Sequence, residues 1–161
     1  MKHIDLNCDL AEGGAFDAAL MPLISSCNIA CGGHFGNDKT ITEAVRLALK
    51  HQVNIGAHPS YPDPENFGRK KLDIELDKLK NTLKTQILAV KTIIERLGGK
   101  LHHVKPHGAL YNEIAKDEEK ARLVVDAVKE IDEQLILFVP PNSVVEAIAK
   151  TKLNTWKEGF A

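Results

Sequence analysis

The chain has 161 residues, with 21 Lys and Arg, 22 Asp and Glu, and a formal net charge of −1. This length is typical of one domain, so we expect a single domain over 1–161. The balanced charge gives no support to nucleic-acid binding or to a polybasic membrane contact. With 43% hydrophobic and 27% charged residues, the chain is too apolar for disorder and too polar for a membrane protein.

The three cysteines, Cys8, Cys27 and Cys31, all lie in apolar segments. Three cysteines cannot all pair within one chain, so we expect buried free thiols, as in a reducing cytoplasm. Cys27 and Cys31 have no second pair that would complete a structural zinc site. No apolar run approaches the roughly 20 residues of a membrane span. The expected protein is therefore cytoplasmic and has no membrane partner.

Strand-like and helix-like segments alternate along the chain. In order, we predict a strand at 4–8, a strand at 27–31, a helix at 38–52, a strand at 53–57, a helix at 74–97, a strand at 101–104, a helix at 116–131, a strand at 135–139, a short helix from 142 or 143 to about 150, and a strand at 153–160. The clearest helix is 74–97, where apolar residues recur every three or four positions before Gly98-Gly99. Repeated strand–helix units predict a parallel α/β sheet with right-handed crossovers.

Two architectures fit this alternation. An open doubly wound sheet favours a Gly-rich phosphate-binding turn after the first strand, but the segment there reads Asp9-Leu10-Ala11-Glu12-Gly13-Gly14. A (β/α) barrel instead places polar functional residues just past the C-terminal ends of its strands. The chain shows this second pattern, so we expect a barrel-type fold.

Polar residues follow four of the predicted strands. They are Asn7, Asp9 and Glu12 after the first, Asn28 and His34 after the second, His58, Asp63 and Arg69 after the third, and Lys105, His107, Tyr111 and Asn112 after the fourth. Each has an ordinary structural alternative, such as a turn cap for Asp9 or a loop hydrogen bond for His58. Because strand ends share one face of a barrel, we expect these residues to surround one small ligand.

Other features receive structural assignments or exclude functions. His51 and His102 are assigned to structure. Glycines are assigned to turns that need positive φ or a close approach of backbone N–H groups to an anion, at Gly32, Gly33, Gly36, Gly56, Gly68 and Gly108. The sequence has no G-x-x-x-x-G-K-[ST] loop, no G-x-S-x-G turn and no H-E-x-x-H helix.

In this order, the motifs resemble the LamB/YcsF family, also described as the A subunit of ATP-dependent 5-oxoprolinase. The matching segments are Asp5–Leu10 with Glu12, Asn28–Gly32 with His34 and Gly36, Ile55–Asp63, Phe67–Arg69, and Val104–Asn112. Ala11 stands where the family usually has Gly, and Asn37 is an extra residue before Asp38.

The resemblance implies a distorted TIM-like barrel of the glycoside hydrolase/deacetylase type. Family members continue past the position of Ala161, so we expect this chain to form an incomplete, open barrel. Its edge near the sixth strand is then poorly ordered or covered by another copy, as in a homo-oligomer. The resemblance also implies ATP-dependent cleavage of 5-oxo-L-proline to L-glutamate, with ATP as co-substrate and subunits B and C as partners.

Under this resemblance the strand-end residues take hypothetical roles. Asp9 or Glu12 is the general base, His58 and His107 transfer protons, and Lys105 holds negative charge. The residues assigned to substrate binding are Asn7, Asn28, His34, Asp63, Arg69, Tyr111 and Asn112, with Arg69 also facing an anion. No residue is assigned as a metal ligand.

Two other functions remain open. One is a metal-dependent amidohydrolase or deacetylase, in which Asp9, His34 and His58 hold a divalent metal that activates water. The other is a non-catalytic subunit that binds the substrate and presents it to a catalytic partner.

Overall fold

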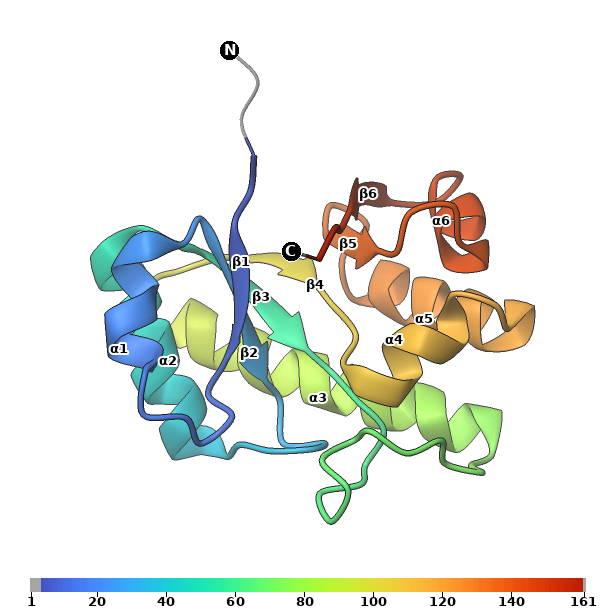
Figure 1. Ribbon diagram of the computed structural model, residues 1–161, viewed down its shortest axis with the longest axis horizontal. Helices are drawn as coiled ribbons and strands as arrows, with labels where there is room; N and C mark the ends of the chain where they lie inside the picture. The colour runs from blue at the N-terminus through green and yellow to red at the C-terminus, as the bar shows by residue number, and fades with distance from the viewer. Residues whose placement is uncertain (1–3, 161) are drawn as a thin grey trace.

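The computed structural model describes residues 4–160 (Figure 1). Its six strands form one sheet, and each neighbouring pair is parallel. The strands are β1 (Asn7–Leu10), β2 (Ser26–Ala30), β3 (Asn54–His58), β4 (Leu101–Val104), β5 (Ile136–Val139) and β6 (Asn154–Lys157). The helices are α1 (Asp17–Leu20), the 3-10 helix η1 (Met21–Leu23), α2 (Asp38–His51), α3 (Leu76–Arg96), α4 (Gly108–Ile114), α5 (Glu118–Ile131) and α6 (Val144–Ala149).

The strand order in the sheet is the order in the sequence, β1-β2-β3-β4-β5-β6. A doubly wound sheet reverses its order at a switch point, and this sheet has no reversal among the described residues. Every predicted strand and helix is present with shifts of a few residues. The α/β class and the parallel sheet are therefore confirmed.

Three short helices were not predicted. Both α1 and η1 lack a side-chain cap at their N-termini, and α1 buries none of its residues, so neither leaves a clear periodic pattern. Helix α4 begins at Gly108, a residue that the sequence assigned to a turn. Its residues Leu110 and Ile114 are buried, four positions apart, so the helix packs against the core through one short stripe.

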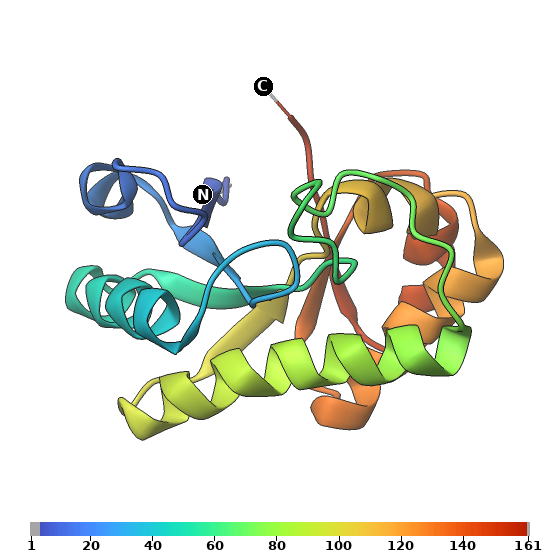
Figure 2. The same ribbon diagram turned by 90° about the horizontal axis from the view of Figure 1, so that it is seen from below.

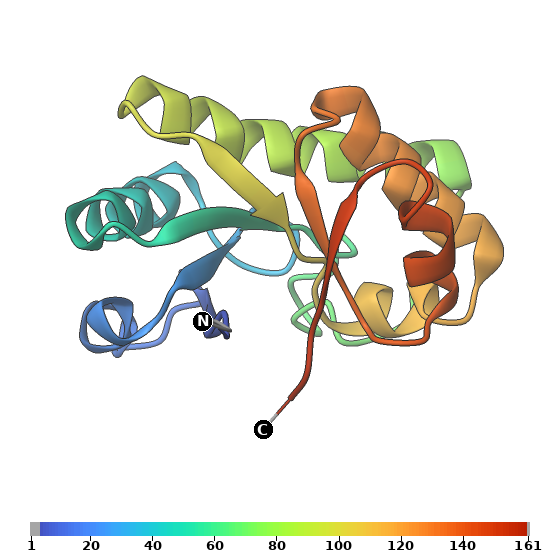
Figure 3. The same cartoon turned by 90° about the horizontal axis from the view of Figure 1, so that it is seen from above.

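The helices lie on the outer side of a curved sheet, and the inner side is open (Figures 2 and 3). Helix α3 shows why: Leu79, Leu83, Ile87, Val90 and Ile94 are buried on one face. They join apolar side chains from alternate strand positions in one hydrophobic core. The outer face of the sheet is therefore the packed face, and the other strand positions point inward.

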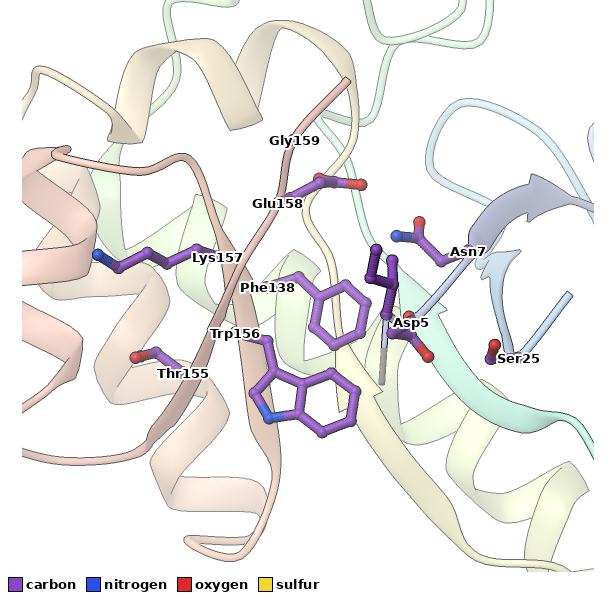
Figure 4. A pocket seen from close by; sticks show the side chains of 10 residues that line it. Asp5, Asn7, Ser25, Phe138, Thr155, Trp156, Lys157, Glu158 and Gly159 are labelled. Atoms are coloured by element: carbon purple, nitrogen blue, oxygen red, sulfur yellow. The ribbon is translucent and has the colours of Figure 1, made fainter. Parts of the chain in front are cut away.

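The edge strands β1 and β6 border the open side of the sheet (Figure 1). A cavity of about 810 Å³ lies between them, as Figure 4 shows, and is lined by Asp5, Asn7, Ser25, Phe138, Trp156 and Glu158, among others. Phe138 stacks on the Trp156 ring at 5.5 Å and on the His103 ring at 4.2 Å. Within residues 4–160, none of the helices is long and apolar enough to cross a membrane.

Candidate functional site

Lys105 ties the two edges of the sheet together. It follows β4, and its Nζ donates to Asp9 Oδ1 of β1 at 3.0 Å and to Glu158 Oε1, just after β6, at 2.7 Å. Burial alone would lower the pKa of Lys105, but Asp9 and Glu158 outweigh it and raise the pKa. The same ion pairs make Lys105, at 6% exposure, a buried cation rather than a surface charge.

Asp9 is held as a carboxylate. Burial raises its pKa, but His58 and Lys105 outweigh this and hold the pKa well below its usual range. Glu158 was not predicted as a site residue. The available signal was its position, two residues past Trp156 in an alternating strand, but nothing in the sequence links that strand to Lys105.

A chain of side-chain amides and imidazoles fixes Asp9 from the other side. Asn28 Nδ2 donates to Asp9 Oδ1 at 2.8 Å and to Asn7 Oδ1 at 2.7 Å. An ionised carboxylate only accepts, so the Asn28 amide must turn its Oδ1 away from Asp9. That oxygen lies 2.8 Å from His103 Nε2, which must therefore carry a proton and donate. His103, buried and with its pKa lowered well below 6.5 by burial, is neutral in this arrangement.

His103 reaches Asn28 because the strand between them carries a glycine. Asn28, Gly56 and His103 occupy neighbouring positions across β2, β3 and β4. A Cβ at Gly56 would overlap the His103 ring. Gly56 thus lies within β3 and makes room for a side chain, which corrects its assignment to a turn.

Three histidines and one carboxylate form a second group next to Asp9. His58 ends β3, Glu12 follows β1, and the loops after β2 and β4 carry His34 and His107. Each of these four side chains has one atom that could bind a metal ion, and these four atoms all lie within 4.8 Å of one another. Glu12 Oε1 is 2.8 Å from His34 Nε2, and the His34 ring stacks on that of His107 at 3.7 Å.

The group holds Glu12 ionised. Burial raises the Glu12 pKa, but the hydrogen bond from His34 and the nearby His58 and His107 lower it below its usual value. Burial lowers the pKa of His107 to about 4, and His58 adds to that effect. The arrangement is a buried cluster of three imidazoles around one carboxylate.

This cluster corrects the metal set that the sequence suggested. The donors that gather are Glu12, His34, His58 and His107, rather than Asp9, His34 and His58. Asp9 still contacts the cluster, because its Oδ2 lies 3.3 Å from His58 Nε2. Predicting this set from the sequence would have required the knowledge that the side chains of Glu12 and His107 turn toward His58.

Most predicted site residues meet, but some do not. Tyr111 is buried near the Phe160 ring, and its pKa is raised by burial and by Glu158. The Asp63 carboxylate instead accepts from the amide of Asn66 within its own loop. Arg69 and Asn112 are exposed, and the Arg69 guanidinium lies over the Phe67 ring at 5.3 Å. The structure does not bring Asp63, Arg69 and Asn112 into either polar group.

The three cysteines are free, but the expectation that all are buried is wrong for Cys8, which is only partly buried. Cys27 and Cys31 are buried, and burial raises the pKa of Cys27 to about 12. Cys31 Sγ accepts the backbone N–H of His58 at 3.1 Å. Cys27 and Cys31 therefore belong to the packed side of the sheet, and Cys31 helps to position His58.

Comparison with known proteins shows which family the chain belongs to. The LamB/YcsF family model matches residues 4–161. The A subunit of 5-oxoprolinase from Haemophilus influenzae (strain PittGG) is 47% identical over 162 residues, covering 100% of this chain and 66% of the relative. The subunit of the same name from Bacillus cytotoxicus is 44% identical over 167 residues, with the same coverage. The chain thus spans 66% of the length of these relatives.

Two solved structures resemble the fold of this chain. The crystal structure of the lactam utilization protein from Thermus thermophilus has a TM-score of 0.94 and 42% identity, covering 99% of this chain and 67% of that one. A protein from Enterococcus faecalis, with a proposed role in cellobiose-phosphate cleavage, has a TM-score of 0.60 at 15% identity, covering 94% and 65% of the chains, and supports the fold alone. From the family match over residues 4–161 and the similarity to these relatives along the whole of this chain, this chain belongs to the LamB/YcsF family.

Proposed function

We propose that this protein acts as the A subunit of ATP-dependent 5-oxoprolinase, which converts 5-oxo-L-proline to L-glutamate together with subunits B and C. Relatives with this subunit name match the whole chain at 44–47% identity. The observation that carries the proposal is the meeting of Asp9, Glu12, His58, Lys105 and His107 in two adjoining polar groups at the C-terminal ends of parallel strands. Such strand ends carry the active sites of barrel enzymes.

The reaction requires several kinds of group in one place. A five-membered lactam is a stable amide that water attacks poorly. Transfer of the γ-phosphoryl group of ATP to the lactam oxygen releases ADP and makes the ring carbon electrophilic. Water then adds to that carbon, and the C–N bond breaks as the nitrogen takes a proton, which leaves γ-glutamyl phosphate. A second water adds to the same carbon, and phosphate leaves with the former lactam oxygen. The site must orient water, move protons and balance negative charge.

The two polar groups suit these tasks. Asp9 and Glu12 are both ionised, so each can accept a hydrogen bond from the attacking water. Lys105 supplies a buried positive charge beside Asp9. Lowered pKa values make both carboxylates weak bases, so removal of a proton from water needs a polarising neighbour. Asn7 offers an amide group for the substrate, while the Asn28 amide is fully used in holding Asn7, Asp9 and His103 in place. The buried hydroxyl of Tyr111 lies near Glu158.

We also propose that the six strands belong to a distorted (β/α) barrel in the cytoplasm. Sequential strand order with helices outside is the barrel arrangement, and the polar residues point to its inside. Subunit names of the relatives support a multi-subunit complex, and the ATP site is assigned to no residue of this chain.

The decisive experiment is ATP-dependent glutamate release from 5-oxoproline. The full-length protein is assayed with and without subunits B and C, and glutamate and ADP are both measured. We expect equal release of glutamate and ADP with all three subunits. Binding of 5-oxoproline without turnover in the complete mixture would instead make the chain a non-catalytic binding subunit.

The histidine cluster favours one second candidate, a metal-dependent amidohydrolase or deacetylase. Imidazole and carboxylate donors are those that bind a catalytic divalent metal. Hydrolysis of an amide without ATP, lost after chelation, would identify this function.

A further inference from the structure

One ring nitrogen of His58 and one of His107 point toward each other, and the hydrogen bonds of the other two nitrogens show that both carry lone pairs. His58 Nδ1 lies 2.6 Å from the carbonyl oxygen of Lys105, and His107 Nε2 lies 2.9 Å from that of Phe67. A carbonyl oxygen only accepts, so both of these nitrogens carry protons. In neutral imidazoles, His58 Nε2 and His107 Nδ1 are then bare acceptors.

These two bare nitrogens lie 2.9 Å apart. Two lone pairs at hydrogen-bond distance repel unless something positive lies between or beside them. The nearest oxygens make the need greater, because Asp9 Oδ2 is 3.3 Å from His58 Nε2 and is itself an acceptor. The pocket therefore requires a proton or a cation at this point.

Glu12 distinguishes a cation from a proton. Its Oε1 lies 3.5 Å from His107 Nδ1 and 3.8 Å from His58 Nε2. Both distances exceed those of charge-assisted hydrogen bonds, which are about 2.7–2.9 Å. They are closer to the separation between ligands of a tetrahedral metal ion, about 3.4 Å for bonds near 2.1 Å, whereas the two nitrogens, 2.9 Å apart, would have to move apart by about 0.5 Å on binding. One proton shared by the two imidazoles would leave Glu12 with its hydrogen bond from His34 but with no bond to either bare nitrogen.

The geometry points to a divalent transition-metal site of the zinc class, held by Glu12 Oε1, His58 Nε2 and His107 Nδ1. Imidazole with carboxylate is a donor set for zinc and its neighbours. Two backbone carbonyls fix the ring tautomers, as outer hydrogen bonds do in metal sites. Three protein ligands leave a fourth position for water or a substrate oxygen.

His34 has a different part in this site. Its Nδ1 is buried without a hydrogen-bond partner among the described residues. A proton on Nδ1 would have no acceptor, so the proton of the neutral ring lies on Nε2. That nitrogen donates to Glu12 Oε1 at 2.8 Å. His34 is therefore a positioning residue that orients the Glu12 carboxylate. The site would also make His58, His107 and Glu12 ligands rather than proton carriers or a base, and it would leave Asp9 as the carboxylate that can accept a hydrogen bond from water.

The inference does not rest on the proposed function, because metal binding is measured without ATP or 5-oxoproline. The protein is freed of metal with a chelator and titrated with Zn²⁺ by calorimetry and with Co²⁺ by visible absorption. We expect one ion per chain and tetrahedral Co²⁺ bands. His58→Gln and His107→Gln should each weaken binding more than about 100-fold, beyond the roughly 10–100-fold expected for His34→Gln.

His102→Gln is the matched control, a histidine outside the cluster, and should bind Zn²⁺ within twofold of the unmodified protein. Because a buried variant can misfold, nitrogen NMR of the histidine rings in the unmodified protein provides a second measurement. Zn²⁺ should shift His58 Nε2 and His107 Nδ1 while the other nitrogen of each ring stays protonated. Unchanged ring signals, or equal Zn²⁺ affinity in the double His58→Gln/His107→Gln variant, would overturn the site and leave a shared proton between the rings.

Discussion

The two faces of the sheet carry opposite chemistry although the same strands build both. On β2, Cys27 and Ile29 join the hydrophobic core under the helices, whereas Ser26 and Asn28 are polar and hydrogen-bonded inward. The outer face is stabilised by apolar burial, which needs no directional partner. The inner face buries polar groups, which are stable only when each finds a partner. The difference predicts that changes on the outer face affect stability alone, whereas changes on the inner face affect function and, where a buried polar group loses its partner, stability as well.

The largest effect should follow from a change that leaves the outer face untouched. Asp9→Asn removes the charge that faces His58 and Lys105, so we expect 5-oxoproline cleavage by the complete complex to fall roughly 10²–10⁴-fold. Asn112→Ala, on the exposed side of α4, is the control and should keep near-normal activity. Normal turnover in Asp9→Asn would show that the Asp9 carboxylate on the inner face takes no part in the reaction.

Lys105→Met tests whether the inner face also contributes to stability. Removing this cation leaves Asp9 and Glu158 buried and unpaired, so the free energy of unfolding should fall by about 3 kcal/mol, at the low end for buried pairs because Asp9 is partly exposed. Adding Glu158→Gln removes one of the two charges and should restore part of the loss. Urea unfolding measures both. Equal stability of Lys105→Met and the unmodified protein would show that the three charges are independently solvated.

The outer face is tested on helix α3 with two leucines. Leu83 is 1% exposed and Leu88 is 43% exposed. Leu83→Ala should lower the free energy of unfolding by about 3 kcal/mol because it leaves a cavity in the core. Leu88→Ala should change it by less than about 0.5 kcal/mol. Zn²⁺ affinity should stay unchanged in both, and a loss of binding in folded Leu83→Ala would show that the two faces are coupled.

Gly56→Ala places a methyl group on the inner face where His103 passes. The ring must move and the His103–Asn28 hydrogen bond must break, so we expect a loss of about 2 kcal/mol in unfolding free energy. The double variant Gly56→Ala/His103→Ala should be less destabilised than the sum of the single variants, because the clash is gone. Additive losses would mean that the two residues do not compete for the same space.

The smallest effect concerns a polar group away from the inner face. Burial raises the pKa of Glu113, but hydrogen bonds from Tyr61, Lys71 and Lys120 lower it below 4.5. A carboxyl whose pKa is lower in the folded state adds stability above pH 4.5, and this is lost as the pH falls through the folded value. Glu113→Gln should therefore cost about 1 kcal/mol at pH 7 and progressively less below pH 4.5.

Tyr61→Phe removes one of those donors and should produce a smaller change of the same sign. Urea unfolding at several pH values measures both variants. A difference between Glu113→Gln and the unmodified protein that grows on acidification would contradict this assignment.

The contacts inside the site were not predictable from the sequence. Glu158 meets Lys105 only because β6 closes toward β1, and His103 meets Asn28 only across Gly56. Residues distant in sequence become partners through strand register, and the register shifts between Ile55 and Gly56. Proton positions on the histidines likewise depend on which carbonyl each ring reaches.

The sequence by itself determined the elements and the end of the sheet where the polar residues gather. Apolar periodicity distinguishes helices from strands, and parallel strands place their C-terminal ends along one edge, so Asp9, His58 and Lys105 had to lie near one another. Only the tertiary structure decided which of them touch. It grouped Glu12 rather than Asp9 with the three histidines and paired Lys105 with Glu158, because hydrogen bonds and ion pairs depend on distances of a few ångströms that strand register and sheet curvature set.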